Sequence, residues 1–181
     1  MYVRFPLSLR NVEDLLFERG IDICHETVRF WWNRFGPLFA ADIKRQRINR
    51  LRGFRLWRWH LDEVFVKING ENHYLWRAVD HEGEERESYA TKSRDKKAAR
   101  RFMKTALKNH GPVETITTDS LPSYKAAMSE LGIQDRQESG RWANFRVENS
   151  HLPFRRRERV MQRFRRMKSL QKFASVHENV R

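Results

Sequence analysis

Cysteine is nearly absent from this chain of 181 residues, which has Cys24 alone. A single cysteine excludes a disulfide framework and a multi-cysteine zinc site. Long hydrophobic runs are also missing. No apolar stretch reaches the roughly 18 residues that a membrane span requires, and the N-terminus carries no signal-peptide pattern. These absences favour a soluble protein of the cytoplasm with no membrane partner.

Acidic residues are outnumbered, with 23 Asp and Glu against 37 Lys and Arg, so the formal net charge is +14. Such an excess favours a polyanionic partner, nucleic acid above all, although a ribosomal or membrane-surface protein would share it. Six tryptophans and an aromatic content of 12% indicate a folded core rather than a disordered basic tail. The length suits one domain with a small appendage.

Hydrophobic alternation predicts a β-hairpin between Trp57 and Asp80. Apolar residues recur at alternate positions on both sides of Asn69-Gly70, which is the period of a half-buried strand. Asn-Gly tolerates the positive φ of a tight two-residue turn, so the pair predicts the connection between the strands. Asp62 lies inside the first strand. Taken alone, it is most simply a carboxylate that faces solvent.

The N-terminal 39 residues carry the pattern of a helix-turn-helix. Ser8 is a plausible N-cap for a helix that ends near Gly20, and a second helix is expected from His25 to Phe35, stopping before Gly36-Pro37. The second helix would present basic and amide side chains to a DNA groove, namely Arg29, Asn33 and Arg34. The alternative is a plain helical hairpin that packs on the next domain. Residues 40–56 form a basic connector, for which we expect phosphate contact rather than a merely solvated face.

The remaining chain, residues 57–181, has the element order of a ribonuclease H-like α/β domain. After the hairpin we expect a third strand, a helix from Asp95 to His110 and a fourth strand that leads into Asp119. A short helix, an edge strand near residues 133–138 and a loop over 140–145 follow. A long basic helix or helix pair then runs from Val147 to the end. Three meandering strands followed by alternating helices and strands predict this mixed fold.

Three acidic residues stand where this fold would gather them. Asp62 lies in the first strand, Asp119 ends the fourth, and Glu148 opens the final helical region. The first and fourth strands are neighbours in this topology, so Asp62 and Asp119 would meet, and the final helix would deliver Glu148. Clustered carboxylates need a cation, and oxygen ligands favour Mg²⁺ or Mn²⁺. Two such ions would suit phosphodiester chemistry.

Each acid also has a plain alternative as a surface carboxylate, and Glu148 would complement a helix dipole in any case. Glu63 points to the opposite face from Asp62, and we expect it to face solvent. His60 shares the Asp62 face and is expected to be a packed, hydrogen-bonded histidine. His151, one turn after Glu148, either packs or faces a phosphate.

A dense basic block follows Glu148. Arginines dominate the stretch HLPFRRRERVMQRFRRMK, and a phosphate-binding surface is a better interpretation than a solvated face. Arg155 lies two turns after Glu148 on the same helical face. We expect the block to contact DNA beside the metal ions through Arg155, Arg156, Arg157 and Arg159.

With these residues assembled, the chain resembles the DDE transposases of bacterial insertion sequences, most closely the sixth insertion-sequence family. The matching stretches include WHLDEVFVKINGENHYLWRAVDHEGE, ITTDSLPSYKAAMSELG and RVENSHLPFRRRER. The resemblance implies that Asp62, Asp119 and Glu148 are the catalytic, metal-binding acids. It also implies that Arg155 is the basic residue that follows the glutamate. The interval from Asp119 to Glu148 is shorter than is usual in this superfamily, and both ends of the chain are expected to be truncated.

The resemblance implies a transposase that binds the terminal inverted repeats of its insertion sequence and catalyses metal-dependent cleavage and strand transfer. Its partners would be the repeats and target DNA, bound by a homo-oligomer at the nucleoid. Two alternatives stay open. One is a structure-selective nuclease of the same fold, and the other is a truncated, inactive DNA-binding remnant.

Overall fold

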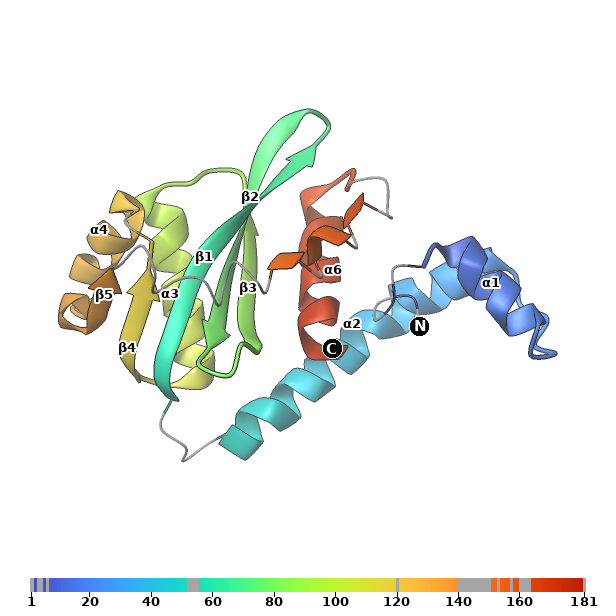
Figure 1. Cartoon of the computed structure of the whole chain (residues 1–181), viewed down its shortest axis with the longest axis horizontal. Coiled ribbons are helices and arrows are strands. Elements are labelled where there is room, and N and C mark those ends of the chain that lie inside the picture. Colours follow the sequence, from blue (N-terminus) through green and yellow to red (C-terminus); the bar gives the residue numbers. More distant parts are fainter. Residues whose placement is uncertain are drawn as a thin grey trace.

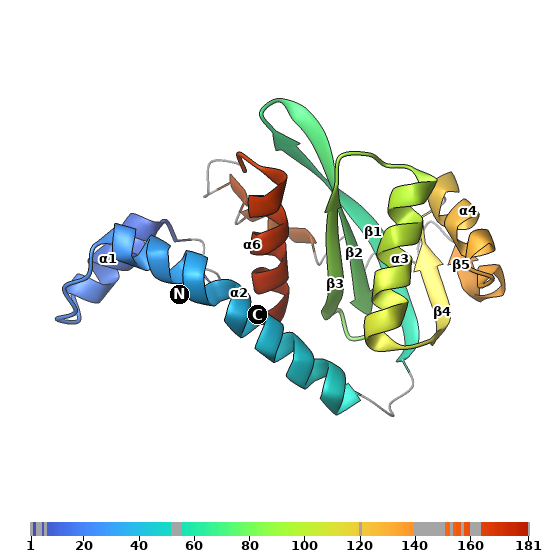
Figure 2. The ribbon, with the colours of Figure 1, turned by 180° about the vertical axis from the view of Figure 1, so that it is seen from behind.

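The computed structural model describes residues 2, 5, 7–51, 56–119, 121–139, 151–152, 154–156, 158–159 and 164–180. Within these residues five strands form one sheet, in the order β3-β2-β1-β4-β5. Helices α3 and α4 cover one face, α6 covers the other, and the long helix α2 runs across α6 (Figure 1). Seen from behind, α3 lies in front of the sheet, while α1 and the start of α2 extend away from it (Figure 2).

The elements have the following bounds in chain order: α1 Leu9–Phe17, α2 His25–Leu51, β1 Leu56–Ile68, β2 Glu71–Asp80, β3 Glu85–Thr91, α3 Lys96–His110, β4 Val113–Thr118, α4 Pro122–Glu130, a 3₁₀ turn Gln134–Arg136, β5 Gln137–Ser139 and α6 Met167–Val180. Residues 151–152, 154–156 and 158–159 are also helical. The expected strands and helices of the sheet domain are present. The expected loop over 140–145 and the start at Val147 lie outside the described residues.

The predicted β1–β2 hairpin is confirmed. Asn69 and Gly70 have φ values of 51° and 83°, and both values are positive as a tight two-residue turn requires. The antiparallel register runs from Trp59 opposite Asp80 to Ile68 opposite Glu71. Two strands of this length give the sheet its central pair.

Local capping rules fix α3. The Asp95 carboxylate accepts a hydrogen bond of 2.8 Å from the Ala98 amide, which satisfies a donor that the first helical turn leaves free. Gly111 ends the helix with φ at 81°, a conformation that glycine adopts without strain. The buried face of α3 then packs against β1 and β2 around Phe102.

Strand alternation divides the core into two clusters. Trp59 and Leu61 of β1 face α3 and α4. Val64, Val66 and Ile68, which are displaced by an odd number of positions, face Phe173 of α6 and the aromatic residues Phe154 and Phe164, which precede that helix. Successive strand residues point to opposite faces, so β1 is buried on both sides.

The expected stop of the second helix at Phe35 is wrong, because α2 continues through Gly36 and Pro37 to Leu51. Proline has no N–H to donate to the carbonyl four residues earlier, here that of Asn33. Lys172 of α6 donates to this carbonyl at 3.2 Å. Much of the region predicted as a connector is therefore helix packed on α6. The division into residues 1–39, 40–56 and 57–181 stays a prediction.

Candidate acidic site at the sheet edge

Asp62 and Asp119 meet where β4 ends beside the central strand β1. Strands β1 and β4 are parallel, and the last pair in their register is Leu61 with Thr118, so the two aspartates follow side by side. One carboxylate oxygen each from Asp62, Glu63 and Asp119 lie within 4.8 Å of one another. The structure thus brings together two of the three predicted acids. Glu148 lies outside the described residues.

Glu63 belongs to this cluster, and the prediction that it faces solvent is wrong. It was expected to face solvent, yet its side chain is 1% exposed. Its carboxylate forms an ion pair with Arg94 and accepts a hydrogen bond of 3.3 Å from the Tyr124 hydroxyl. Glu63 shares its strand face with Trp59 and Leu61, so alternation did place it toward the core. The error was to assign that face to solvent.

Burial and neighbouring charge act on Glu63 in opposite directions. Loss of solvation raises its pKa, the Asp119 carboxylate raises it further, and Arg94 lowers it, with a result of about 7. Burial, together with repulsion from the neighbouring acids, therefore outweighs the single guanidinium. A cluster with such repulsion has a strong electrostatic affinity for an added cation.

Arg94, which the sequence analysis did not single out, belongs to this site. Its guanidinium lies 3.6 Å from an Asp119 oxygen and 5.3 Å from the centroid of the Phe65 ring. It comes from the loop between β3 and α3. No periodicity or spacing in the sequence connects that loop to the ends of β1 and β4.

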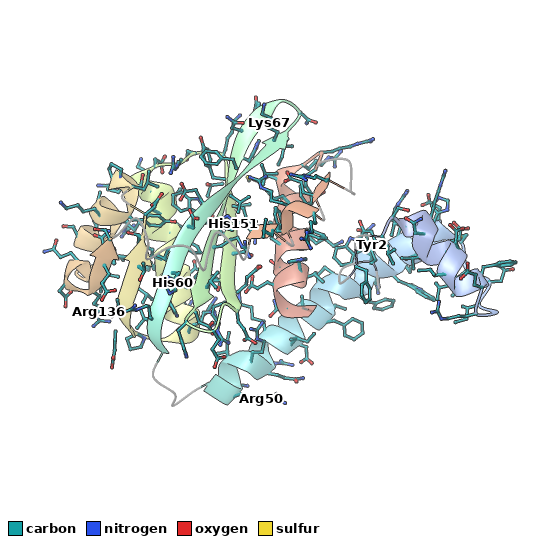
Figure 3. The ribbon with its side chains drawn as sticks, in the orientation of Figure 1. Tyr2, Arg50, His60, Lys67, Arg136 and His151 are labelled. Carbon is teal, nitrogen blue, oxygen red and sulfur yellow. The ribbon has the colours of Figure 1, made fainter. Side chains whose placement is uncertain are left out.

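Asp62 has polar neighbours on two sides. One oxygen accepts a hydrogen bond of 2.7 Å from the Glu63 amide, and the other lies 3.7 Å from Nε2 of His151. Burial, then the charges of Arg77 and Arg155, lower the His151 pKa to about 3. The imidazole is therefore neutral at pH 7 and forms no ion pair. His151 and His60 are labelled in Figure 3, and His60 is buried as expected.

The predicted DNA contacts are distributed over two regions. On α2, Arg29 pairs with Glu26 at 2.9 Å, the Asn33 side chain accepts from Lys172 at 2.7 Å, and Arg34 is exposed. In the second region, the helical residues 154–156, Arg155 pairs with Glu158 at 2.8 Å. Arg156 and Arg159 are exposed, and Arg157 lies outside the described residues. The α2 residues lie on a helix that leads away from the sheet (Figure 1).

The donor set fits a hard divalent cation. Carboxylate oxygens from Asp62, Glu63 and Asp119 converge, and Mg²⁺ and Mn²⁺ prefer oxygen ligands. Asp119 is partly exposed, which leaves the cluster open to solvent and to a substrate. In the part of the chain that the structure describes, no helix is long and apolar enough to cross a membrane.

Comparisons with known proteins agree with this geometry. A family model described as a DDE domain matches residues 56–181. The transposase of the insertion sequence-like element IS431mec from Staphylococcus aureus is 33% identical over 130 residues, which are 72% of this chain and 56% of that protein. The transposase of IS257 in transposon Tn4003, also from Staphylococcus aureus, is 32% identical over the same shares. The chain thus spans little more than half the length of these relatives.

A structural likeness supports the fold. A chain of the simian T-cell lymphotropic virus intasome, solved in complex with PP2A regulatory subunit B56 gamma, superposes with a TM-score of 0.50. It is 14% identical, and the match covers 69% of this chain and 48% of that one. The likeness confirms the predicted ribonuclease H-like fold.

Proposed function

Because this chain belongs to the DDE transposases of insertion sequences, we propose that it cleaves and joins DNA at the ends of its own element. Its substrates are the terminal inverted repeats and a target DNA. The reaction is metal-dependent cleavage of a phosphodiester, followed by transfer of the 3′-hydroxyl end to the target. Because two ends must be joined, the protein acts as a homo-oligomer on DNA, at the bacterial nucleoid.

One observation carries this proposal, the convergence of Asp62, inside β1, with Asp119, which follows the carboxyl end of the adjacent parallel strand β4. Open sheets bind ligands at the carboxyl ends of their strands. Two facing carboxylates would hold a divalent cation, and such a cation together with a strongly basic chain would suit a polyanionic substrate. Asp119 is partly exposed, so a substrate can approach the two carboxylates from solvent.

Asp62, Asp119 and Glu148 would hold Mg²⁺ or Mn²⁺, with two ions in the full site. When bound, such ions activate a water or hydroxyl nucleophile and stabilise the leaving oxygen. The protein's own residues orient the site: the Glu63 amide fixes one Asp62 oxygen, and the Leu121 amide donates to Asp119 at 3.2 Å. No covalent intermediate with the protein is required.

DNA is held by two basic regions in this proposal. Arg29, Asn33 and Arg34 of α2 contact the inverted repeat, and Arg155, Arg156, Arg157 and Arg159 contact phosphates beside the acids. Asn33 engages DNA only if it gives up its hydrogen bond with Lys172. Phosphate contacts of this kind make affinity fall steeply with salt.

The test is a cleavage and strand-transfer assay on duplexes that end in the element's inverted repeat, with Mg²⁺ or Mn²⁺. We expect Asp119→Asn to abolish both products while DNA binding persists, and Asp135→Asn, on an exposed turn, to leave them unchanged. Cleavage without strand transfer would identify a nuclease instead. Binding with no cleavage by the unmodified chain would identify an inactive DNA-binding protein and overturn the proposal.

A further inference from the structure

Arg94 is a positively charged side chain that contacts two residues of the acidic cluster, Glu63 and Asp119. We propose that Arg94 is a positioning residue that competes with the divalent cation for the acidic cluster and so sets its metal affinity. This inference rests on the proposed function, because it concerns the same site. It adds a residue from outside the three acids and assigns it an opposing role.

The contacts of Arg94 join two of the carboxylates. Its guanidinium forms an ion pair with buried Glu63 and approaches Asp119 to 3.6 Å. The ring of Phe65 lies below it at 5.3 Å. The side chain is 31% exposed, so it lies at the mouth of the cluster rather than beneath it. A forked, planar cation suits this bridging of two carboxylates.

The backbone around Arg94 is held in place. The Ser123 hydroxyl at the start of α4 donates to the Arg94 carbonyl at 3.4 Å. The next residue, Asp95, caps α3 through the Ala98 amide. The backbone that carries Arg94 is therefore anchored between the two helices that cover this face of the sheet, which places the side chain within reach of the acids.

Electrostatics makes Arg94 and a metal ion competitors. A cation coordinated by Asp62 and Asp119 would lie within a few ångströms of the guanidinium, because the three carboxylate oxygens lie within 4.8 Å of one another. Like charges at such separations repel strongly in a partly buried site. Arg94 also engages Glu63, which keeps that carboxylate from contributing as a further oxygen ligand.

Removing the guanidinium charge should therefore tighten metal binding. Arg94→Gln leaves three mutually repelling acids without their protein cation, and it frees Glu63 to face the metal. A purely structural role predicts the opposite sign, because loss of support for Asp119 would weaken binding. The sign of the change separates the two roles.

The experiment is isothermal titration of the full chain with MnCl₂. We expect Arg94→Gln to lower the dissociation constant about tenfold. Arg94→Lys, which keeps the charge but loses the fork, should bind about threefold more tightly than the unmodified chain. Lys92→Gln is the matched control. It removes one charge from the same loop, but Lys92 is 72% exposed and pairs with Glu71 rather than with the acids, so its constant should stay within about twofold.

Weaker or unchanged binding by Arg94→Gln would overturn the inference, as would equal tightening by Lys92→Gln. If Arg94→Gln fails to give a cooperative thermal melt, the Arg94→Lys result decides in the same way.

Mn²⁺ binding by Asp119→Asn distinguishes failure of the inference on Arg94 from failure of the proposed function. If it abolishes Mn²⁺ binding while Arg94→Gln tightens nothing, only the inference falls. If the unmodified chain binds no Mn²⁺, the metal site of the proposed function falls with it.

Discussion

The face of the sheet under α3 and α4 is packed mainly with apolar side chains, whereas the face under α6 combines an apolar and aromatic cluster with several buried ionic and polar groups. On the first face, Trp59, Trp76 and Phe102 are almost fully buried. On the second, Arg77 forms a buried ion pair with Glu85, and Ser88 donates to Glu178 at 2.9 Å. The acidic site lies where the two faces meet, with Glu63 from one and Asp62 from the other.

The two faces also differ in how the chain closes them. The first is closed by α3 and α4, which directly follow the strands. The second needs α2 and α6, which are far apart in sequence: Arg47 donates to the Glu178 carbonyl across 131 residues at 3.1 Å. Contacts of large sequence separation cost more chain entropy to form. We infer that both faces are stabilised by packing and that polar pairing adds more to the second than to the first.

The largest effect should come from the apolar face. Phe102→Ala removes a ring with 0% exposure and should lower the free energy of unfolding by about 4 kcal/mol. Urea denaturation measures the change. Phe30→Ala is the control, since Phe30 is 59% exposed and its loss should cost under about 0.5 kcal/mol. Equal losses would show that the first face is not a tightly packed core.

Breaking the buried ion pair on the α6 face should cost almost as much. Arg77→Met leaves the Glu85 carboxylate buried without its partner and should lower the free energy of unfolding by about 3 kcal/mol. Adding Glu85→Leu should recover most of this loss, because the uncompensated charge is gone. If the double variant is as unstable as the single one, Arg77 contributes through packing. Arg100→Met, at an exposed pair, serves as control.

The α6 face should also carry a pH dependence. Burial raises the pKa of Glu178 to about 7 from 4.5, with the Lys44 charge opposing. The folded state then binds the proton more tightly, so this contribution is full below about pH 4.5 and is lost as pH rises through 7. The free energy of unfolding should fall between pH 5 and pH 8, and this fall should be about 2 kcal/mol smaller in Glu178→Gln than in the unmodified chain.

Urea denaturation at the two pH values, in the presence of a chelator, measures this loss. Exposed Glu130→Gln is the control. Part of the slope should persist, because the pKa of Glu63 is also raised to about 7. An unchanged slope in Glu178→Gln would show that Glu178 is already ionised in the folded protein.

The smallest effect concerns the contact between α2 and α6. Lys172→Met removes the donor to the Asn33 carbonyl and should cost about 1 kcal/mol. In a Pro37→Ala background the restored amide can pair with that carbonyl, so the same substitution should cost less. A double-mutant cycle measures the coupling. Strict additivity would show that Lys172 does not compensate for the proline. Lys168→Met is the control.

Residues that obey local rules were predicted correctly from sequence. Asn69-Gly70 specified its turn and Asp95 the start of its helix, whereas the meeting of Asp62 with Asp119 followed from the order of the strands. The errors arose where distant residues decide. Pro37 stays inside a helix, and Lys172 of α6 donates to the Asn33 carbonyl that the proline cannot pair with. Glu63 is buried by Tyr124 and Arg94, which come from later segments that strand periodicity cannot pair with it.

The uninterrupted course of α2 has a geometric consequence for the whole molecule. At 1.5 Å per residue, its 27 residues span about 40 Å. One end packs on α1, and the other is joined to the sheet through Lys44 and Glu87 at 2.6 Å. A continuous helix of this length sets both the reach and the angular position of α1. One inserted residue would turn α1 by about 100°, whereas seven would restore its direction to within about 20° and move it outward by about 10 Å.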